Sequence, residues 1–192
     1  MSRPKKLSRR RFIQITATVA AAGPAISCTK TVNLWRFFTV QEARTLQAIC
    51  ERIIPADQDP GAAEASVVNY IDRQLMGHFK RHQRAYREGI LRVNQTSLAL
   101  FGKEFVALAT EGQTKVLVAL EKNEAPGEIW KGRSAARFFD LVVTHTMQGF
   151  YGDPRHGGNR EGVSWKMLGV PYPPVRGRLH YDLSKSPNRQ GT

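Results

Sequence analysis

The chain has 192 residues, of which 41% are hydrophobic and 23% charged, a composition that excludes an intrinsically disordered protein. Its length allows one domain with a targeting segment and excludes two ordinary domains. Much of the net charge of +13 lies in residues 1–27, which contain six Lys and Arg and no acid. The rest of the chain contains 23 basic and 16 acidic residues. Because no nucleic-acid motif accompanies this charge, we expect no nucleic-acid partner.

Residues 1–28 are predicted to be a signal peptide. A basic start is followed by a weakly apolar stretch from Phe12 to Ala22, which is too short and too polar for the roughly 20 apolar residues of a membrane span. The run from Ser8 to Gln14 resembles the twin-arginine export motif, with Arg9, Arg10 and Phe12 as its defining residues. A generic basic n-region is the alternative interpretation.

The export route has a consequence for function. The twin-arginine machinery carries folded proteins, often with a bound cofactor, yet the sequence contains no GxGxxG, CxxC, CxxCH or P-loop motif. We therefore expect no catalytic, cofactor-binding or metal-binding residue in this chain. This chain carries an export signal for folded proteins but has no motif for a cofactor. The combination indicates that the cofactor is bound by another polypeptide, which is exported together with this chain.

The two cysteines differ in setting. Cys28 follows Ala25, Ile26 and Ser27, an imperfect lipoprotein cleavage site because Leu is usual in place of Ala25. Lipidation of Cys28 would strengthen membrane attachment, and ordinary cleavage nearby is the alternative. Cys50 lies within an apolar helical pattern and is expected to be a small buried hydrophobe, since nothing requires a disulfide.

Apolar spacing predicts an all-α domain of five to six helices. Thr39 and Glu42 form a capping box before a helix that Pro55 stops, and a turn cluster with Asp57 and Asp59 follows. Further helices are expected over about 62–76, 79–101 and 134–148, with another possible cap at Thr110. The side chains expected to point inward are Ala43, Leu46, Ile49, Cys50, Ile53, Val67, Val68, Ile71, Leu75, Tyr86, Ile90, Val93, Leu98, Phe101, Val116, Leu117, Leu120, Phe138, Phe139, Leu141, Val142 and Thr146.

The segment 149–174 is predicted to be a long C-terminal loop. It contains six glycines and four prolines together with Tyr151, Trp165 and Tyr172. An ordered loop of this length is usually functional.

Isolated polar residues suggest other chemistry only weakly. His78 and His82 are four residues apart on a helix, but a metal would need a third ligand, and a solvated basic face explains them better. His145, Asp153 and His156 lack a nucleophile or a second carboxylate, so an independent enzyme is not favoured. Asp57 and Asp59 lack the spacing of a calcium loop.

Several short motifs, taken together, resemble the gluconate 2-dehydrogenase subunit 3 family. They run from about Phe38 to Pro173 and are Phe37–Thr39, Ile53–Asp57, Pro60–Ala62 with Ala65, Tyr70–Asp72, Gly149–Pro154, Gly157–Arg160, Trp165 and Gly169–Pro171. His156 stands where Tyr is more usual, a local departure. The family-like helical domain would cover residues 37–175, followed by a basic tail at 176–192.

This resemblance implies a non-catalytic accessory subunit of a periplasmic, membrane-associated dehydrogenase of sugars, polyols or sugar acids. Its partner would be an FAD-dependent large subunit of the glucose–methanol–choline type, and a membrane-bound multihaem cytochrome c, with haem c, would take the electrons. The small subunit would help the flavoprotein mature and escort it through export. A free periplasmic binding or chaperone-like protein without an enzyme partner is the alternative function.

The predicted loop is the candidate surface for the flavoprotein. Arg160 and Trp165 have the character of interface anchors, and the predicted contact residues are Tyr151, Asp153, Asn159, Arg160 and Trp165. The alternative is a loop that folds over its own helices, with Trp165 in the core.

Overall fold

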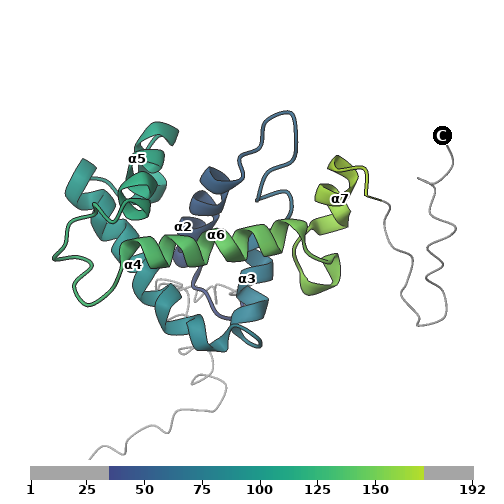
Figure 1. The fold of residues 1–192 in the computed structure, drawn as a ribbon, viewed down its shortest axis with the longest axis horizontal. Helices are drawn as coiled ribbons and strands as arrows, with labels where there is room; N and C mark the ends of the chain where they lie inside the picture. The colour runs from purple at the N-terminus through teal and green to yellow at the C-terminus, as the bar shows by residue number, and fades with distance from the viewer. Residues whose placement is uncertain (1–34, 171–192) are drawn as a thin grey trace, which may run out of the picture. The chain divides into compact units, whose positions relative to one another are not determined.

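A computed structural model describes residues 35–170 of the chain. These residues form six α-helices and no strand, labelled α2 to α7 in Figure 1. The helices are α2 (Val40–Ile53), α3 (Val67–Leu75), α4 (Gln83–Phe101), α5 (Thr110–Glu121), α6 (Ala135–Tyr151) and α7 (Val163–Met167). The all-α prediction is thus confirmed for this part of the chain. The predicted signal peptide, with Arg9, Arg10, Phe12 and Cys28, and the tail at 176–192 lie outside the described residues.

Local signals place the beginnings of two helices. At α2, Thr39 Oγ1 accepts a hydrogen bond from the Glu42 amide (3.2 Å), and the Thr39 amide donates to Glu42 Oε2 (2.8 Å), which confirms the capping box. At α6, Ser134 Oγ accepts from the Arg137 amide (3.2 Å). Each side chain satisfies an amide that the first turn leaves without an intrahelical partner.

Three predicted boundaries are wrong. Helix α3 begins at Val67 instead of 62, because Ser66 has a left-handed backbone (φ 56°) that a continuous helix cannot contain. Helix α4 begins at Gln83, after a 3₁₀ turn at Lys80–His82. The cap of α5 is Ala109, whose extended backbone precedes the helix, so that Thr110 is already helical.

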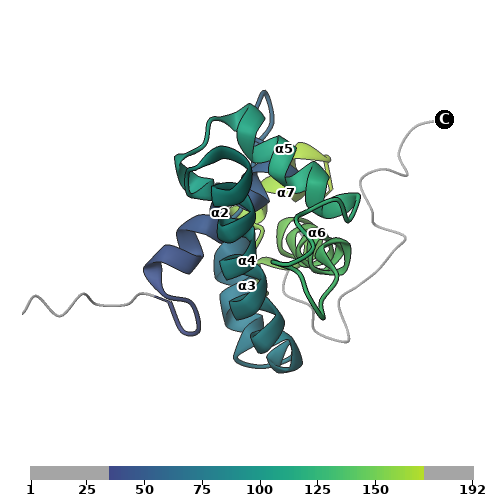
Figure 2. The ribbon, with the colours of Figure 1, turned by 90° about the vertical axis from the view of Figure 1, so that its left-hand side faces the viewer.

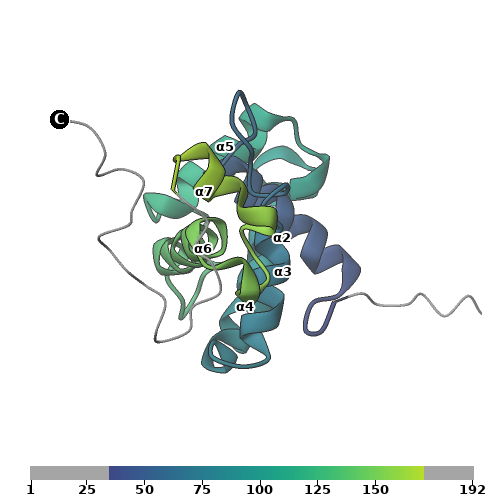
Figure 3. The same cartoon turned by 90° about the vertical axis from the view of Figure 1, so that its right-hand side faces the viewer.

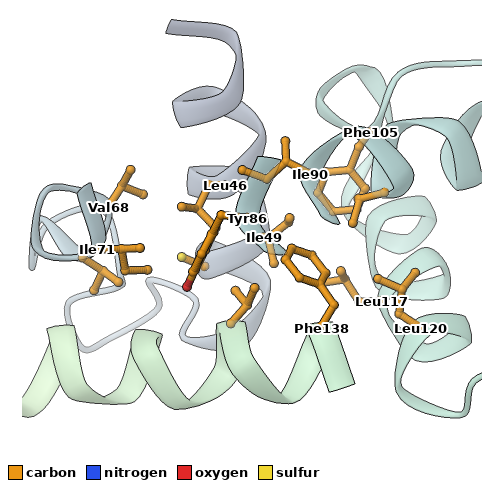
Figure 4. Close-up of a cluster of buried hydrophobic side chains, with 14 of the residues drawn as sticks. Leu46, Ile49, Val68, Ile71, Tyr86, Ile90, Phe105, Leu117, Leu120 and Phe138 are labelled. Atoms are coloured by element: carbon orange, nitrogen blue, oxygen red, sulfur yellow. The ribbon is translucent and has the colours of Figure 1, made fainter. Parts of the chain in front are cut away.

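The core lies where α2 and α6 meet the other helices. Each of these two helices contacts α3, α4 and α5 as well as the other, an arrangement that can be followed in Figures 1 and 2. Figure 4 shows apolar side chains from α2, α3, α4, α5 and α6 converging on Tyr86 and Ile49.

Most of the side chains expected inward are buried, but Leu98 and Phe101 are 48% and 39% exposed. They lie on a part of α4 that no described element covers, so this part of the prediction is wrong.

Polar groups in the core are paired between segments that are distant in the chain. Cys50 is fully buried, as expected, with Sγ 3.3 Å from Thr146 Oγ1, and burial raises the pKa of its thiol to about 12. Trp130 Nε1 donates to Thr96 Oγ1 at 3.0 Å. Since a buried polar group without a partner is costly, these bonds help to specify which helices meet.

The chain that enters α2 is held by one carboxylate. Asp72 on α3 is fully buried and accepts hydrogen bonds from the amides of Arg36, Phe37 and Phe38 at 2.8, 2.9 and 3.1 Å. Three donors satisfy a buried charge that would otherwise be expensive.

Within residues 35–170, no helix combines the length and hydrophobicity needed to cross a membrane.

Candidate partner interface

The C-terminal segment of the described chain is more regular than predicted. Helix α6 continues to Tyr151, and beyond it the chain forms 3₁₀ turns at Pro154–His156 and Arg160–Gly162 and then α7. Figure 3 views the side of the molecule on which this segment lies. The predicted long loop therefore contains helical parts, because residues 149–151 end α6 and residues 163–167 form α7, while the glycines and Pro154 between them separate short 3₁₀ turns.

Asn159 holds the middle of this segment together. Its amide donates to the Gly149 carbonyl (2.8 Å), its Nδ2 to the Gly152 carbonyl (2.9 Å), and its Oδ1 accepts from the Ser164 amide (3.0 Å). The residue is fully buried and has a left-handed backbone (φ 42°), which Asn tolerates better than most residues. The side chain of this predicted contact residue is thus used inside the chain.

The segment is also bonded to helix α3. Asn69 Nδ2 donates to the Gly157 carbonyl at 2.7 Å, and the Arg160 amide donates to the Ala65 carbonyl at 3.1 Å. At Gly158, a Cβ would lie 2.1 Å from the Gly149 carbonyl oxygen, so only glycine allows this close approach. The backbone from 157 to 160 is therefore hydrogen-bonded to α3, to the turn before α3 and to α6.

Asp153 also has an internal role. Its carboxylate accepts from the Arg155 amide (3.0 Å) and from the Arg155 guanidinium (2.8 and 3.1 Å). The hydrogen bonds from this guanidinium, followed by the one from the backbone amide, lower the pKa of Asp153 to about 2. Asp153 therefore caps the turn that begins at Pro154.

The other three predicted contact residues face outward. Tyr151 is 39% exposed, and Arg160 extends into solvent beside Glu161, with 3.7 Å between Nε and Oε1. Trp165 is partly exposed and lies outside the buried core, while its Nε1 donates to the Tyr151 carbonyl at 2.9 Å. The segment does fold over its own helices, as the alternative held, but Trp165 does not belong to the buried core. Contact with a partner stays a prediction.

Further exposed apolar side chains lie near Tyr151 and Trp165 along the chain. Met147 lies one turn before Tyr151 on α6, Leu168 lies three residues beyond Trp165, and the Val170 amide donates to the Trp165 carbonyl (2.8 Å). Met147, Leu168 and Val170 are 42%, 57% and 46% exposed. We call Met147, Tyr151, Trp165, Leu168 and Val170 the Trp165 surface. An apolar group of this kind is typical of a protein-binding surface.

The isolated polar residues have structural roles. His145 is buried, with Nδ1 2.9 Å from Tyr86 Oη, whereas His156 is exposed and the Asp153 carboxylate bonds Arg155, so the three residues form no acid–base group. Asp57 accepts from the Asp59 amide at 2.9 Å, as expected for a turn former. Among the described residues, no three His, Cys, Asp or Glu side chains, including His78 and His82, are grouped to hold a metal.

Comparison with known proteins identifies the family of this chain. A model of the family described as gluconate 2-dehydrogenase subunit 3 matches residues 40–171, within the 37–175 expected from the sequence motifs. No curated protein and no solved structure matches the chain. The family match covers α2 to α7, including the Trp165 surface, and its name describes one subunit of a dehydrogenase complex. The chain therefore belongs to the gluconate 2-dehydrogenase subunit 3 family.

Proposed function

We propose that this chain is a non-catalytic accessory subunit that binds an FAD-dependent large subunit through the Trp165 surface and Arg160. The observation that carries the proposal is the combination of a hydrogen-bonded backbone with exposed and partly exposed side chains. Asn159, Gly158 and Asn69 attach the segment to α3 and α6, while Tyr151 and Leu168 are exposed and Trp165 is partly exposed. A surface organised before binding loses little conformational entropy on association.

Membership of a dehydrogenase subunit family supports the choice of partner. The large subunit would be a flavoprotein of the glucose–methanol–choline type that oxidises a sugar, a polyol or a sugar acid such as gluconate. A membrane-bound multihaem cytochrome c would accept the electrons. FAD and haem c would belong to these partners, because the present sequence contains no dinucleotide-binding or haem-attachment motif.

The proposed route to the periplasm depends on the leader. With Arg9, Arg10 and Phe12 as its export motif, the chain would carry the folded flavoprotein through the twin-arginine machinery. The complex would then be associated with the membrane through the cytochrome, and a lipid on Cys28 would add a second attachment.

The contact is tested by removing its two anchors. Trp165→Ala and Arg160→Ala are each expected to weaken association with the flavoprotein roughly thirtyfold, because truncation of a central Trp or Arg often costs about 2 kcal/mol. The affinity is measured by titrating the purified flavoprotein with each variant. Because Trp165 lies outside the core, we expect both variants to remain folded by circular dichroism.

Matched controls use residues of the same kinds elsewhere on the surface. Leu91 on α4 is 58% exposed and Arg44 on α2 is exposed, so Leu91→Ala and Arg44→Ala remove apolar and basic side chains away from the Trp165 surface. These controls are expected to bind as tightly as the parent. Parent-like affinity in folded Trp165→Ala and Arg160→Ala variants would show that the contact lies elsewhere.

The escort role is tested in cells that lack this chain. The flavoprotein is expected to remain in the cytoplasm without it and to reach the periplasm when it is restored. A flavoprotein that is exported equally well in both strains contradicts the escort role. If the two proteins also fail to associate after purification, the alternative of a free periplasmic binding or chaperone-like protein is favoured.

A further inference from the structure

An arginine-rich groove lies on a part of the molecule that the proposed interface does not use. It has a volume of about 550 Å³ and is bordered by α4, the beginning of α6 and the connection from α5 to α6, elements that Figure 2 shows together. Its charged lining consists of Arg81, Arg84, Glu88, Arg92, Arg133 and Arg137. Trp130, Phe138 and Leu141 form an apolar floor. We call this feature the arginine groove.

The arginine groove accounts for the net positive charge of the helical domain. Residues 35–170 contain 18 Lys and Arg against 15 Asp and Glu, whereas the groove alone holds five Arg and one Glu. The remaining described residues carry 13 basic and 14 acidic side chains and are thus nearly neutral. The basic character of this domain is therefore local, which indicates an anionic ligand at one place.

A single carboxylate organises three of the five arginines. Glu88 Oε2 lies 3.0 Å from Arg133 Nε and 3.9 Å from Arg92 Nη2, and Glu88 Oε1 bonds Arg84. Hydrogen bonds from Arg84 and then Arg133 lower the pKa of Glu88 to about 2, so this carboxylate stays ionised. One carboxylate cannot neutralise the five arginines of the groove. Arg81 and Arg137 form no ion pair with any described residue.

The rest of the chain is an unsuitable occupant. Residues 1–34 and 171–192 together contain 11 Lys and Arg, and Asp182 is their only acid. Such segments would be repelled by the arginines of the groove. These segments therefore do not supply an acidic occupant, and another molecule is the better source.

We propose that the arginine groove binds an acidic peptide segment of another subunit of the dehydrogenase complex, in which carboxylates flank an apolar side chain. Guanidinium groups bind carboxylates in paired hydrogen bonds, and the floor of Trp130, Phe138 and Leu141 accepts an apolar group. A free sugar acid fits this lining less well, because the hydroxyls placed over the floor would lose their hydrogen bonds. This surface is separate from the Trp165 surface and does not depend on the escort role.

The test uses the purified full chain without any flavoprotein. The probes are a set of short fluorescent peptides in which Asp or Glu pairs flank Leu, Phe or Trp at varied spacing, and a matched set has Asn and Gln in place of the acids. Binding is followed by fluorescence anisotropy. At least one acidic peptide is expected to bind ten times more tightly than its neutral match, and raising the salt from about 50 to about 500 mM should weaken it.

Charge-reversal variants locate the binding. Arg81→Glu with Arg137→Glu is expected to weaken peptide binding at least tenfold, because both guanidiniums line the groove and lack a carboxylate partner among the described residues. The matched control, Arg44→Glu with Lys115→Glu, changes the net charge equally at exposed positions outside the groove. It is expected to bind like the parent.

Three outcomes overturn the proposal. Equal binding of the acidic and neutral sets would remove the role of the carboxylates, and equal weakening in both double variants would reduce the effect to overall charge. Absence of peptide binding, together with groove-dependent binding to vesicles of anionic phospholipid, would identify a lipid surface as the ligand instead. None of these results would bear on flavoprotein binding at Trp165, which is measured separately.

Discussion

His145 is a titratable side chain enclosed by aromatic rings. Its imidazole stacks on Phe79 with the ring centroids 3.9 Å apart, and its Nδ1 shares a hydrogen bond with Tyr86 Oη. Burial, and then the charges of His82 and Arg81, lower its pKa from 6.5 to about 4. The folded protein therefore keeps this histidine neutral at pH values at which the unfolded chain protonates it.

We predict that this histidine makes the protein less stable in mild acid. As the pH falls from 6.5 towards 4, the unfolded chain binds a proton that the folded protein does not, so the free energy of unfolding decreases. The loss is complete below the folded pKa and should reach about 3 kcal/mol, because each pKa unit corresponds to about 1.4 kcal/mol.

Denaturant unfolding at a series of pH values tests this prediction. His145→Gln should flatten the pH dependence of stability between pH 4 and 6.5, whatever its effect on stability at neutral pH. His156→Gln, at an exposed position, is the control that should retain the parent profile. A parent-like slope in His145→Gln would assign the acid sensitivity to other groups.

At the scale of elements, one glycine allows α4 and α6 to approach closely. A Cβ at Gly89 would lie 2.1 Å from the ring of Phe138 on α6. The same approach brings Arg84, Arg92 and Glu88 of α4 alongside Arg137 of α6 in the arginine groove. The contact between these helices thus affects both the core and the groove.

We predict that Gly89→Ala destabilises the fold although alanine is the better helix former. The overpacking against Phe138 should cost about 3 kcal/mol, against a helix-propensity gain of about 1 kcal/mol, for a net loss of about 2 kcal/mol. Gly112→Ala on α5 is the matched control, because its Cβ would contact only the side chain of Leu108, at 3.3 Å. Thermal and urea unfolding of both variants provide the comparison. If Gly89→Ala is as stable as the parent, α4 and α6 can separate without cost.

At the scale of the whole molecule, the chain combines a helical domain that carries two separate candidate surfaces with a predicted export leader. The Trp165 surface lies at the end of α6 and on α7, whereas the arginine groove lies between α4 and the beginning of α6. Two surfaces on one small domain suit a subunit that contacts more than one neighbour. The name of the family implies a subunit of a dehydrogenase complex, and the predicted leader would place that complex in the periplasm.

We predict that replacing Arg9 and Arg10 together by Lys lowers the periplasmic fraction of this chain severalfold. Lysine keeps the positive charge but lacks the planar guanidinium that distinguishes arginine in recognition. The periplasmic and cytoplasmic fractions are compared by immunoblotting, with Lys5→Arg and Lys6→Arg as a control that leaves Arg9 and Arg10 in place. Unchanged export of the Lys variant would mean that the leader uses another route.

The main helices could be predicted from the sequence because their signals are local. Thr39 and Glu42 are three residues apart and cap α2 without help from the rest of the fold. The apolar spacing of Val67, Val68, Ile71 and Leu75 correctly identified the buried face of α3. The left-handed backbone of Ser66, which sets the beginning of α3, had no comparable local signal.

The candidate site could be predicted only in part. Its segment was located by the glycines, Trp165 and the family motifs, but the sequence could not separate Asn159, which bonds inside the chain, from Arg160, which faces solvent. The arginine groove was missed. Arg81, Arg84, Glu88 and Arg92 follow helical spacing and could have indicated one charged face, but Arg133 and Arg137 are about 40 residues further along the chain.

The sequence by itself determined the helical class, the cap of α2, the buried faces of α2 and α3 and the short motifs of the family, because each of these depends on residues close together in the chain. Only the tertiary structure decided which polar side chains are enclosed, as with Asn159, Asp72 and His145, and which are left to face a partner. It also brought the arginines of α4 and α6 to one groove. Burial and charge density depend on which elements meet, and that is decided by the packing of residues distant in sequence.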